Sequence, residues 1–322
     1  MKRSLALIIT IILLAILGLI SRSKNPSLPC VAIANLGPHA SLENCITGII
    51  DELSSLGYRD GEEIRIVKDH VNFDPNLILQ MLSKLKSCNP EVLVTLTTPV
   101  TQAARGRIND IPQVFSLITD PAAAGLLKDK KLTGISDAQD LDGFLLFALS
   151  LLPQAKTMGL LYSTSEANDQ ALVKFFQQAT QPHQLELMAI PLSSAGEVPM
   201  RMEGFRGKVD FIYTGSSGAV QSAFPAIISS ANAMNIPVFD FDEGSVLKHQ
   251  ALGSFAVSYY ELGRHTAQMV VAILKGKKTA DIPPYFPKTT DHRALVSTVQ
   301  LEKFKLRLPE KNNIILVPRE QK

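Results

Sequence analysis

Short apolar runs alternate with amphipathic segments along most of the chain, and this alternation constrains the fold more than any other feature. The runs have the length and composition of strands, and the longer segments between them have helical spacing. Strand and helix in alternation predict an α/β fold with parallel sheets. The alternation begins afresh after Pro153, and 322 residues are enough for two packed cores, so we expect two lobes.

The expected elements fall into two series, separated at Pro153. The expected strands are 30–35, 64–67, 92–95, 114–117 and 131–135, then 158–162, 185–190, 209–213, 236–239 and 252–256. The expected helices are 44–56, 75–86, 100–107, 141–152, 166–180, 218–234 and 261–275. The tail from Lys277 is rich in Pro and Lys, and we expect it to cross between the lobes or lie along the surface.

Two polar loops follow neighbouring strands of the first series, Thr97-Thr98-Pro99 and Thr119-Asp120-Pro121. Open parallel sheets bind ligands at the carboxyl ends of their strands. The loops offer hydroxyls, backbone N–H groups beside a helix start and one carboxylate, a set that suits a small zwitterion. The alternative is that Thr and Asp before Pro act only as helix caps and turn formers.

The second series adds polar groups at equivalent places. One loop carries Tyr162, Glu166, Asn168 and Asp169, and the others are 214–218, with Ser216 and Ser217, and 240–245, with Asp242. A cleft lined in this way suits an amino acid, with its carboxylate on helix-start N–H groups, its ammonium on Asp120 or Glu166, and its side chain against Tyr or Phe. Alternatively, Glu166 only complements a helix dipole and Tyr162 only seals a sheet edge.

Composition and motifs exclude several other classes. The net charge of +2 provides no field for nucleic acid, and Trp is absent. The chain has no nucleotide fingerprint after its first strand and no Gly-x-Ser-x-Gly elbow, and its histidines lack metal-site spacing. We therefore expect no cofactor, no metal and no catalysis. The adjacent pair Asp242 and Glu243 is weak evidence for acid-base chemistry, because neighbouring loop residues point in different directions.

The N-terminus begins Met1-Lys2-Arg3 and continues with an apolar run over residues 5–20, the layout of an export signal. The run is long for a signal core and short for a membrane span, so cleavage before Lys24 and retention as an anchor both stay open. Cys30 lacks the preceding pattern of a lipid anchor. Three scattered cysteines permit a bridge between Cys45 and Cys88, although buried free thiols are the more common arrangement.

Several segments together resemble one known family. They are LSSLGYRDGEEIRI, TTPVTQAARGRINDIPQVFSLITDPAAAGLL, LTGISD, LLPQAKTMGLLYSTSEAND, GKVDFIYTGSSGAV, IPVFDFDEGSV and SYYELGRHTAQMVVAILKGKKTADIP. In this order and spacing they resemble the ABC-transporter substrate-binding proteins, a family that includes tryptophan and tyrosine uptake proteins. The resemblance covers nearly all of the chain after the N-terminal apolar run.

This resemblance implies a type I periplasmic-binding-protein architecture: two Rossmann-like lobes with a ligand between them and three hinge crossovers, near Ser136, Val257 and Pro283. The first lobe then comprises residues 30–136 with 258–282 and the second 137–257 with 283–322, preceded by a signal or anchor and linker over 1–29. The implied function is an exported solute receptor, without enzymatic activity, that delivers an amino-acid-like ligand, preferably aromatic, to an ABC permease.

The family pattern places the ligand against residues from both lobes. They are Thr98, Pro99, Gln102, Thr119 and Asp120 on one side and Tyr162, Glu166, Asn168 and Asp169 on the other. The chain departs from the pattern at Ser216-Ser217, where Asp-Asn is common, and at Asn168-Asp169, where Asn-Ser is common; Asp242 is a candidate to compensate. Two alternatives remain: a ligand sensor for a signalling partner, and a Rossmann-type enzyme that uses Asp120, Glu166 and Tyr162.

Overall fold

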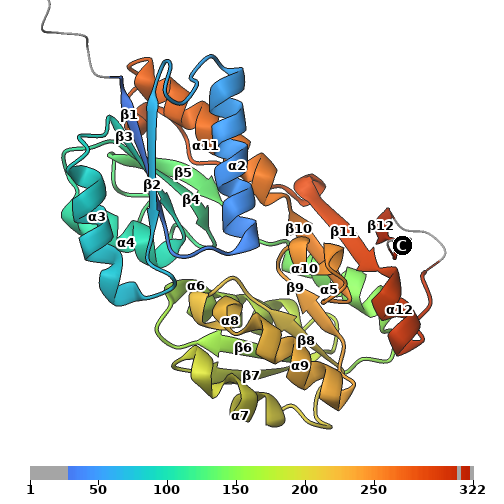
Figure 1. The fold of residues 1–322 in the computed structure, drawn as a ribbon. Helices are drawn as coiled ribbons and strands as arrows, with labels where there is room; N and C mark the ends of the chain where they lie inside the picture. Colours follow the sequence, from blue (N-terminus) through green and yellow to red (C-terminus); the bar gives the residue numbers. More distant parts are fainter. Residues whose placement is uncertain (1–27, 310–312, 320–322) are drawn as a thin grey trace, which may run out of the picture.

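The computed structural model describes residues 28–309 and 313–319, and the expected signal or anchor within residues 1–27 lies outside them. The described chain forms two α/β lobes, each built on its own sheet (Figure 1). The first sheet has five strands in the order β2-β1-β3-β4-β5, all parallel, and the second has seven in the order β12-β11-β10-β9-β8-β6-β7. The α/β class and the two-lobed architecture expected from the sequence are confirmed.

The first lobe is a sheet covered by helices on both faces. Its strands are β1 (Cys30–Asn35), β2 (Arg65–His70), β3 (Val92–Leu96), β4 (Gln113–Ile118) and β5 (Leu132–Ser136). Its helices are α2 (Ala40–Ser55), α3 (Ile78–Lys86, after the short turn Pro75–Leu77), α4 (Thr98–Arg107) and α11 (Tyr259–Leu274). Alternate residues of β1 face opposite layers: Val31 and Ile33 pack with α2, whereas Ala32 and Ala34 pack with α3 and α4.

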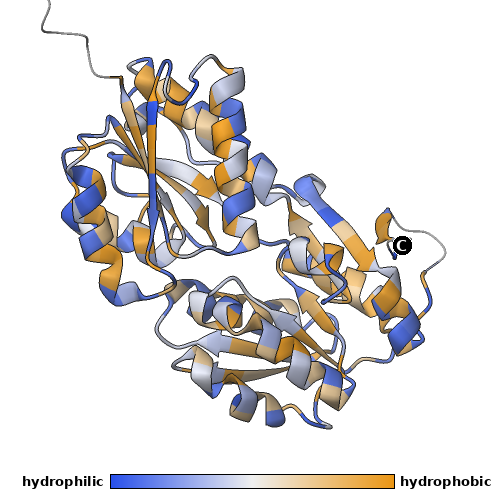
Figure 2. Cartoon of the chain, in the orientation of Figure 1, coloured by the Kyte–Doolittle hydropathy of each residue, from blue (hydrophilic) through white to orange (hydrophobic). Residues whose placement is uncertain are grey.

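The second lobe repeats this layering around a longer sheet. Its strands are β6 (Thr157–Ser163), β7 (Glu186–Leu192), β8 (Phe211–Thr214), β9 (Val238–Asp240), β10 (Gly253–Val257), β11 (His292–Ser297) and β12 (Ile314–Val317). Its helices are α5 (Leu141–Leu151), α6 (Ala167–Ala179), α7 (Val198–Glu203), α8 (Gly218–Ser222), α9 (Phe224–Met234), α10 (Gly244–Leu247) and α12 (Thr298–Phe304). Aromatic rings from α5, α6, β8 and β9 meet edge to face in its core. Figure 2 shows apolar residues gathered on the strands of both sheets.

The structure corrects four of the sequence-based expectations. Helix α2 begins at Ala40 rather than at residue 44, because His39 caps it by accepting the Ser41 N–H. Helix α4 begins at Thr98, so Thr98 and Pro99 lie in its first turn, where Pro is well tolerated. The segment 218–234 is two helices that meet at Ala223, next to Pro225. The tail does not simply cross or lie on the surface: it adds β11 and β12 to the second sheet, with β11 antiparallel to β10.

The chain passes between the two sheets three times. It leaves the first sheet after β5, returns after β10 to form α11 against α2 and β4, and leaves again before β11. The third passage stays attached to the first sheet through a bridge between Tyr285 and Ile135. These passages match the crossovers implied by the family resemblance, and the exact lobe boundaries stay a prediction.

Helices α2 and α11 cross at unusually short range. A Cβ atom at Gly48 would lie 2.1 Å from the Tyr260 carbonyl oxygen, and one at Gly263 would lie 2.1 Å from the Cys45 carbonyl oxygen. Each glycine therefore gives the backbone of the other helix room to approach. The contact fixes α11, which follows the second passage, on the first lobe.

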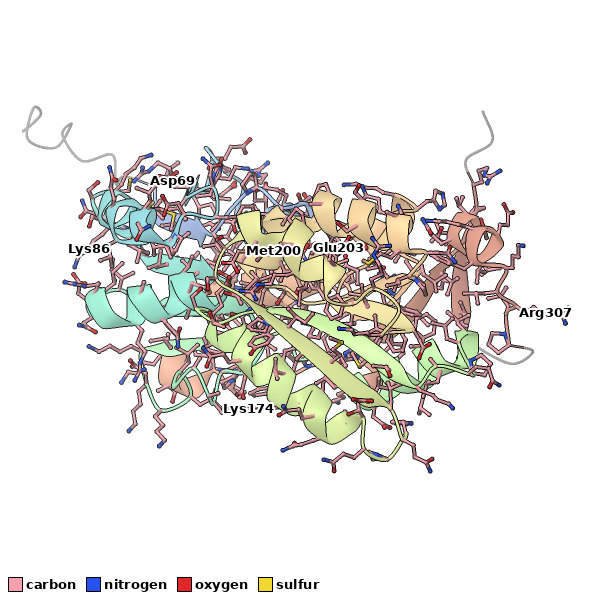
Figure 3. All side chains as sticks on the ribbon, turned by 90° about the horizontal axis from the view of Figure 1, so that it is seen from below. Asp69, Lys86, Lys174, Met200, Glu203 and Arg307 are labelled. Carbon is pink, nitrogen blue, oxygen red and sulfur yellow. The ribbon has the colours of Figure 1, made fainter. Side chains whose placement is uncertain are left out.

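The periphery is polar, and Figure 3 shows Lys86, Lys174 and Arg307 projecting outward from it. The described helices include none that is long and apolar enough for a membrane span. The three cysteines are free, and Cys45 lies with its sulfur 3.6 Å from Ser116 Oγ, so Cys45 and Cys88 are not bridged. The described residues also hold no cluster of three or more His, Cys, Asp or Glu suited to a metal ion.

We predict that Gly263→Ala lowers the free energy of unfolding by about 1–3 kcal/mol, because its methyl group would overlap a backbone carbonyl that cannot move independently. Chemical denaturation monitored by circular dichroism measures the effect. Gly106→Ala is the matched control, because Gly106 lies exposed in α4 with open space around it, and alanine there should be neutral or slightly stabilising. Equal stability of both variants would show that the two helices separate without cost.

Candidate functional site

A cavity lies between the lobes, where the carboxyl ends of both sets of parallel strands meet. Its main part has an empty volume of about 430 Å³, open solvent at its mouth included. The lining residues of this part are Leu36, His39, Leu42, Phe73, Thr97, Thr98, Leu117, Thr119, Asp137, Glu166, Asn168, Ser216, Gln221, Phe241 and Tyr259. A smaller inner part shares Thr119, Asp137, Asn168, Ser216 and Phe241 and adds Gln139, Asp169, Leu172, Tyr213 and Gly215.

Three lining residues hold backbone conformations that side chains rarely adopt. Phe73, in the loop after β2, has φ +64°. Thr97, after β3, has φ +74°, and Leu117, near the end of β4, has φ +60°. Positive φ is a genuine outlier for a β-branched residue such as threonine, and such strain gathers at binding sites. At Leu117 it coincides with a register shift between β4 and β5. The first lobe therefore presents its two loops to the cavity through strained backbone.

Unpaired polar atoms are concentrated around the cavity. Nine buried side-chain atoms of the described residues lack a hydrogen-bond partner. Five of the nine belong to cavity-lining residues: Thr97 Oγ1, Asp137 Oδ1, Gln139 Oε1, Asn168 Oδ1 and Gln221 Oε1. Because a buried polar atom without a partner costs about 1–3 kcal/mol, this concentration indicates a site built to receive the polar groups of a ligand.

Asp137 is a deeply buried carboxyl group of the cavity wall, with 3% of its surface exposed. The Tyr259 hydroxyl donates a hydrogen bond to Oδ2, whereas Oδ1 has no partner. Desolvation raises the pKa of Asp137, and the hydrogen bonds from Tyr259 and Thr119 oppose that rise. A cationic ligand group at Oδ1 would supply the missing partner and stabilise the ionised carboxylate.

A hydrogen-bonded latch joins the lobes beside the cavity. Ser41, in the first turn of α2, donates its hydroxyl to Asp242 of the second lobe, and its Oγ lies 3.0 Å from His39 Nδ1. Desolvation lowers the pKa of His39, and the Asp242 carboxylate opposes this shift. The neighbouring Asp240 is fully buried and accepts hydrogen bonds from Thr214 Oγ1 and the Phe241 N–H. Burial, followed by the Asp242 charge, raises the pKa of Asp240 to about 8.

Other acids of the second lobe hold its own loops in place. The Glu166 carboxylate accepts the N–H groups of Gly218 and Ala219 at 3.1 and 3.2 Å, so it caps α8 from the start of α6. Asp169 accepts the Ser163 N–H at 2.6 Å, and desolvation raises its pKa to about 7. These contacts fix the loop after β6 against the loop after β8.

The structure divides the residues expected from the sequence into two groups. Six line the main or inner part of the cavity: Thr98, Thr119, Glu166, Asn168, Asp169 and Ser216. Ser217, the next residue along the chain, caps α8 by accepting the Val220 N–H.

The remaining expected residues lie outside the lining of the cavity. Asp120 accepts the Ala123 N–H at 2.9 Å and borders an open groove on the surface, and Asp242 belongs to the latch. Pro99 and Gln102 lie in α4, and Tyr162 lies half-buried in β6. A ligand contact of these residues stays a prediction.

Sequence reasoning missed several residues of the cavity wall. Asp137 lies just beyond the expected strand 131–135 and was not among the expected site residues, and neither were Phe73, Gln221 and Tyr259. The available signal for Asp137 was its position directly after an apolar strand, the same position that drew attention to Thr119. Phe73 and Gln221 carry no such signal, because they reach the cavity from a loop and from the inner face of a helix.

Two α/β lobes joined by three passages, with unpaired polar groups in the cavity between them, define a two-lobed receptor for a small ligand. Residues 30–319 match the family model described as ABC transporter substrate binding protein. The chain therefore belongs to the ABC transporter substrate-binding protein family, as the sequence motifs indicated.

Similar proteins come from several bacteria. A protein of Clostridioides difficile (strain R20291) named tyrosine-binding protein is 30% identical over 258 residues, which cover 79% of this chain and 74% of that protein. The crystal structure of an ABC domain from Streptococcus pneumonia in complex with L-Trp has a TM-score of 0.84 at 25% identity, covering 90% of this chain and all of that one.

A ligand-free, open structure of a substrate-binding protein with adhesive properties from Clostridium difficile has a TM-score of 0.67 at 28% identity, covering 91% of this chain and 100% of that chain. The higher score against the L-Trp complex, at a similar identity, agrees with the Ser41–Asp242 contact between the lobes. The lobes of this structure are closed on the cavity.

We predict that Asp240→Asn changes the pH dependence of stability. The pKa of Asp240 is about 8 in the folded chain against 3.8 for an ordinary aspartate, so its contribution to stability is present below about pH 4 and is lost as the pH rises to about 8. The free energy of unfolding of Asp240→Asn, relative to that of the original chain, should therefore increase with pH across this window, by at most about 1.4 kcal/mol per pH unit. Calorimetric thermal midpoints at pH 5 and pH 8 test this, with Asp281→Asn on the surface as control. A pH-independent difference for Asp240→Asn would contradict it.

Proposed function

We propose that this chain is the exported solute-binding component of an ABC transporter, which captures an aromatic amino acid between its lobes and delivers it to a permease. The observation that carries the proposal is that one cavity has both a polar part and an apolar part. Unpaired polar groups, including a buried carboxylate, lie beside a wall of apolar and aromatic side chains. An aromatic amino acid matches both parts, because it joins a charged carboxylate and ammonium to an apolar ring in one small molecule.

The ligand carboxylate is assigned to the start of α4. No side chain caps this ten-residue helix, so the N–H groups of its first turn are available to an anion, with the helix dipole in its favour. Thr97 Oγ1 is buried without a partner, and Thr98 also lines the cavity. The strained backbone at Thr97 is what turns these groups toward the cleft.

The ligand ammonium is assigned to Asp137, with Asn168 as its second acceptor. Both residues line the part of the cavity that its two compartments share, and each has an unpaired side-chain oxygen. The partners expected from the sequence were Asp120 or Glu166. Asp120 already accepts a backbone N–H in its own turn and lines the outer groove, and both oxygens of Glu166 accept backbone N–H groups of α8. Thr97 of the first lobe, Asn168 of the second lobe and Asp137 at the first crossover are thus assigned to the carboxylate and the ammonium of the ligand.

The side chain of the ligand is assigned to the apolar part of the cavity. Leu36, Leu42 and Phe73 form this part from the first lobe, and Phe241 closes it from the second. Phe241 lies edge to face with Tyr259 at a centroid distance of 5.6 Å. A further ring inserted here would gain edge or offset contacts with aromatic neighbours.

Closure links binding to delivery. Ligand contacts from both lobes favour the closed arrangement by their differential binding free energy, and the Ser41–Asp242 latch forms only when the lobes meet. A permease that recognises the closed arrangement then receives a loaded receptor. The names of two relatives, one tyrosine-binding and one in complex with L-Trp, support an aromatic ligand for this chain.

We predict that tyrosine or tryptophan raises the thermal midpoint of the chain and that Asp137→Asn weakens this binding about 10- to 100-fold. The substitution keeps an acceptor for Tyr259 but removes the charge that faces the ammonium. Calorimetric titration of the chain from residue 28 onward measures the dissociation constants. Asp120→Asn is the matched control and should bind like the original chain. Unchanged affinity in Asp137→Asn would refute the assignment of the ammonium.

A further inference from the structure

One buried side chain of the cavity, that of Gln221, takes no part in the contacts proposed for the carboxylate and the ammonium of the ligand. Gln221, on α8, has 5% of its surface exposed and lines the main part of the cavity. Its Nε2 donates to the Gly215 carbonyl oxygen at 2.6 Å. Its Oε1 is buried without a hydrogen-bond partner.

The orientation of this amide follows from its neighbour. A carbonyl oxygen only accepts hydrogen bonds, so the NH₂ end of Gln221 must face Gly215, and the oxygen must face away from it. The unpaired Gln221 Oε1 is therefore an acceptor and not a donor. A buried acceptor of this kind is stabilised by a ligand that carries a donor.

The position of Gln221 separates it from the groups assigned to the ammonium. Asp137 and Asn168 line both compartments of the cavity, whereas Gln221 lines only the main one, together with the apolar residues Leu36 and Phe73. Of the three N–H donors of an amino acid's own ammonium, two are assigned to Asp137 and Asn168 in the shared part of the cavity. For Gln221, beside the apolar residues of the main part, the donor is assigned to the side chain of the ligand.

Other polar groups in this compartment are either paired or already assigned to the two ends of the amino acid. Both Glu166 oxygens accept backbone N–H groups of α8, and His39 Nδ1 lies against Ser41. The unpaired oxygens of Thr97, Asp137 and Asn168 are assigned to the carboxylate and the ammonium. Among the described residues that line this compartment, Gln221 thus offers the unpaired acceptor that remains for the side chain of the ligand.

We propose that Gln221 is a specificity-determining residue, which accepts a hydrogen bond from a donor on the ring of the ligand. This inference rests on the proposed function and deepens it: the receptor selects phenol or indole side chains over a plain phenyl ring. A site built around such a hydrogen bond rejects the analogue that lacks the donor, because binding that analogue leaves a buried acceptor unpaired.

The first test changes the ligand and leaves the chain intact. Dissociation constants are measured by calorimetric titration for tyrosine, phenylalanine and O-methyltyrosine, and for tryptophan and 1-methyltryptophan. We expect tyrosine or tryptophan to bind about tenfold or more tightly than its counterpart without a donor. Equal binding of phenylalanine, tyrosine and tryptophan would overturn the role of Gln221 and leave aromatic amino-acid binding standing. Failure of all the aromatic amino acids would overturn the proposed function and this inference with it.

The second test removes the acceptor. Gln221→Met keeps a side chain of similar length without an amide, and it should reduce the preference for tyrosine over phenylalanine to within about threefold while phenylalanine still binds. Gln177→Met, at an exposed position of α6, is the matched control and should keep the original preference. A Gln221→Met variant that retains the full preference would refute the proposal. If that variant does not fold, the ligand series in the unaltered chain decides the question independently.

Discussion

The close crossing of α2 and α11 is the contact on which the rest of the site depends. Gly48 and Gly263 allow the two backbones to approach, and the positions of both helix starts follow from this approach. The start of α2 carries His39 and Ser41 to the second lobe, and the start of α11 places Tyr259 against Asp137. One packing contact between two helices therefore positions both the latch and the charged acceptor beside the cavity.

The cavity is also where the fold leaves its hydrogen bonds incomplete. Glu166 and Asp169 of the cavity wall are satisfied by backbone donors of the second lobe. Asp137, Asn168 and Gln221 instead keep one free oxygen each. This contrast separates supporting acids from receiving groups, although all of them line the same cavity. Burial alone does not distinguish the two groups, whereas the presence or absence of hydrogen-bond partners does.

Much of this arrangement was predictable from the sequence, because two periodicities carry the fold. Alternating strands and helices gave the parallel sheets, and polar residues at strand ends located Thr98, Thr119 and Asn168 on the cavity wall. The strands β11 and β12 were missed, since Pro and Lys in the tail hide two short runs that only gain partners in the completed sheet. Gln221 was missed for a related reason: whether an amide is paired depends on contacts that no local pattern records.

The repeated passage of the chain between the lobes has a consequence for how the protein folds during its synthesis. The first sheet obtains its covering helix α11 only after the strands β6 to β10 of the second lobe have been made. The second sheet obtains β11 and β12 only from the last part of the described chain. Neither lobe is one contiguous stretch of chain: the first is completed by α11 after most of the second has been made, and the second is completed by β11 and β12 after α11. Folding of one whole lobe before synthesis of the other begins, the usual route for two-domain chains, is therefore closed to this one.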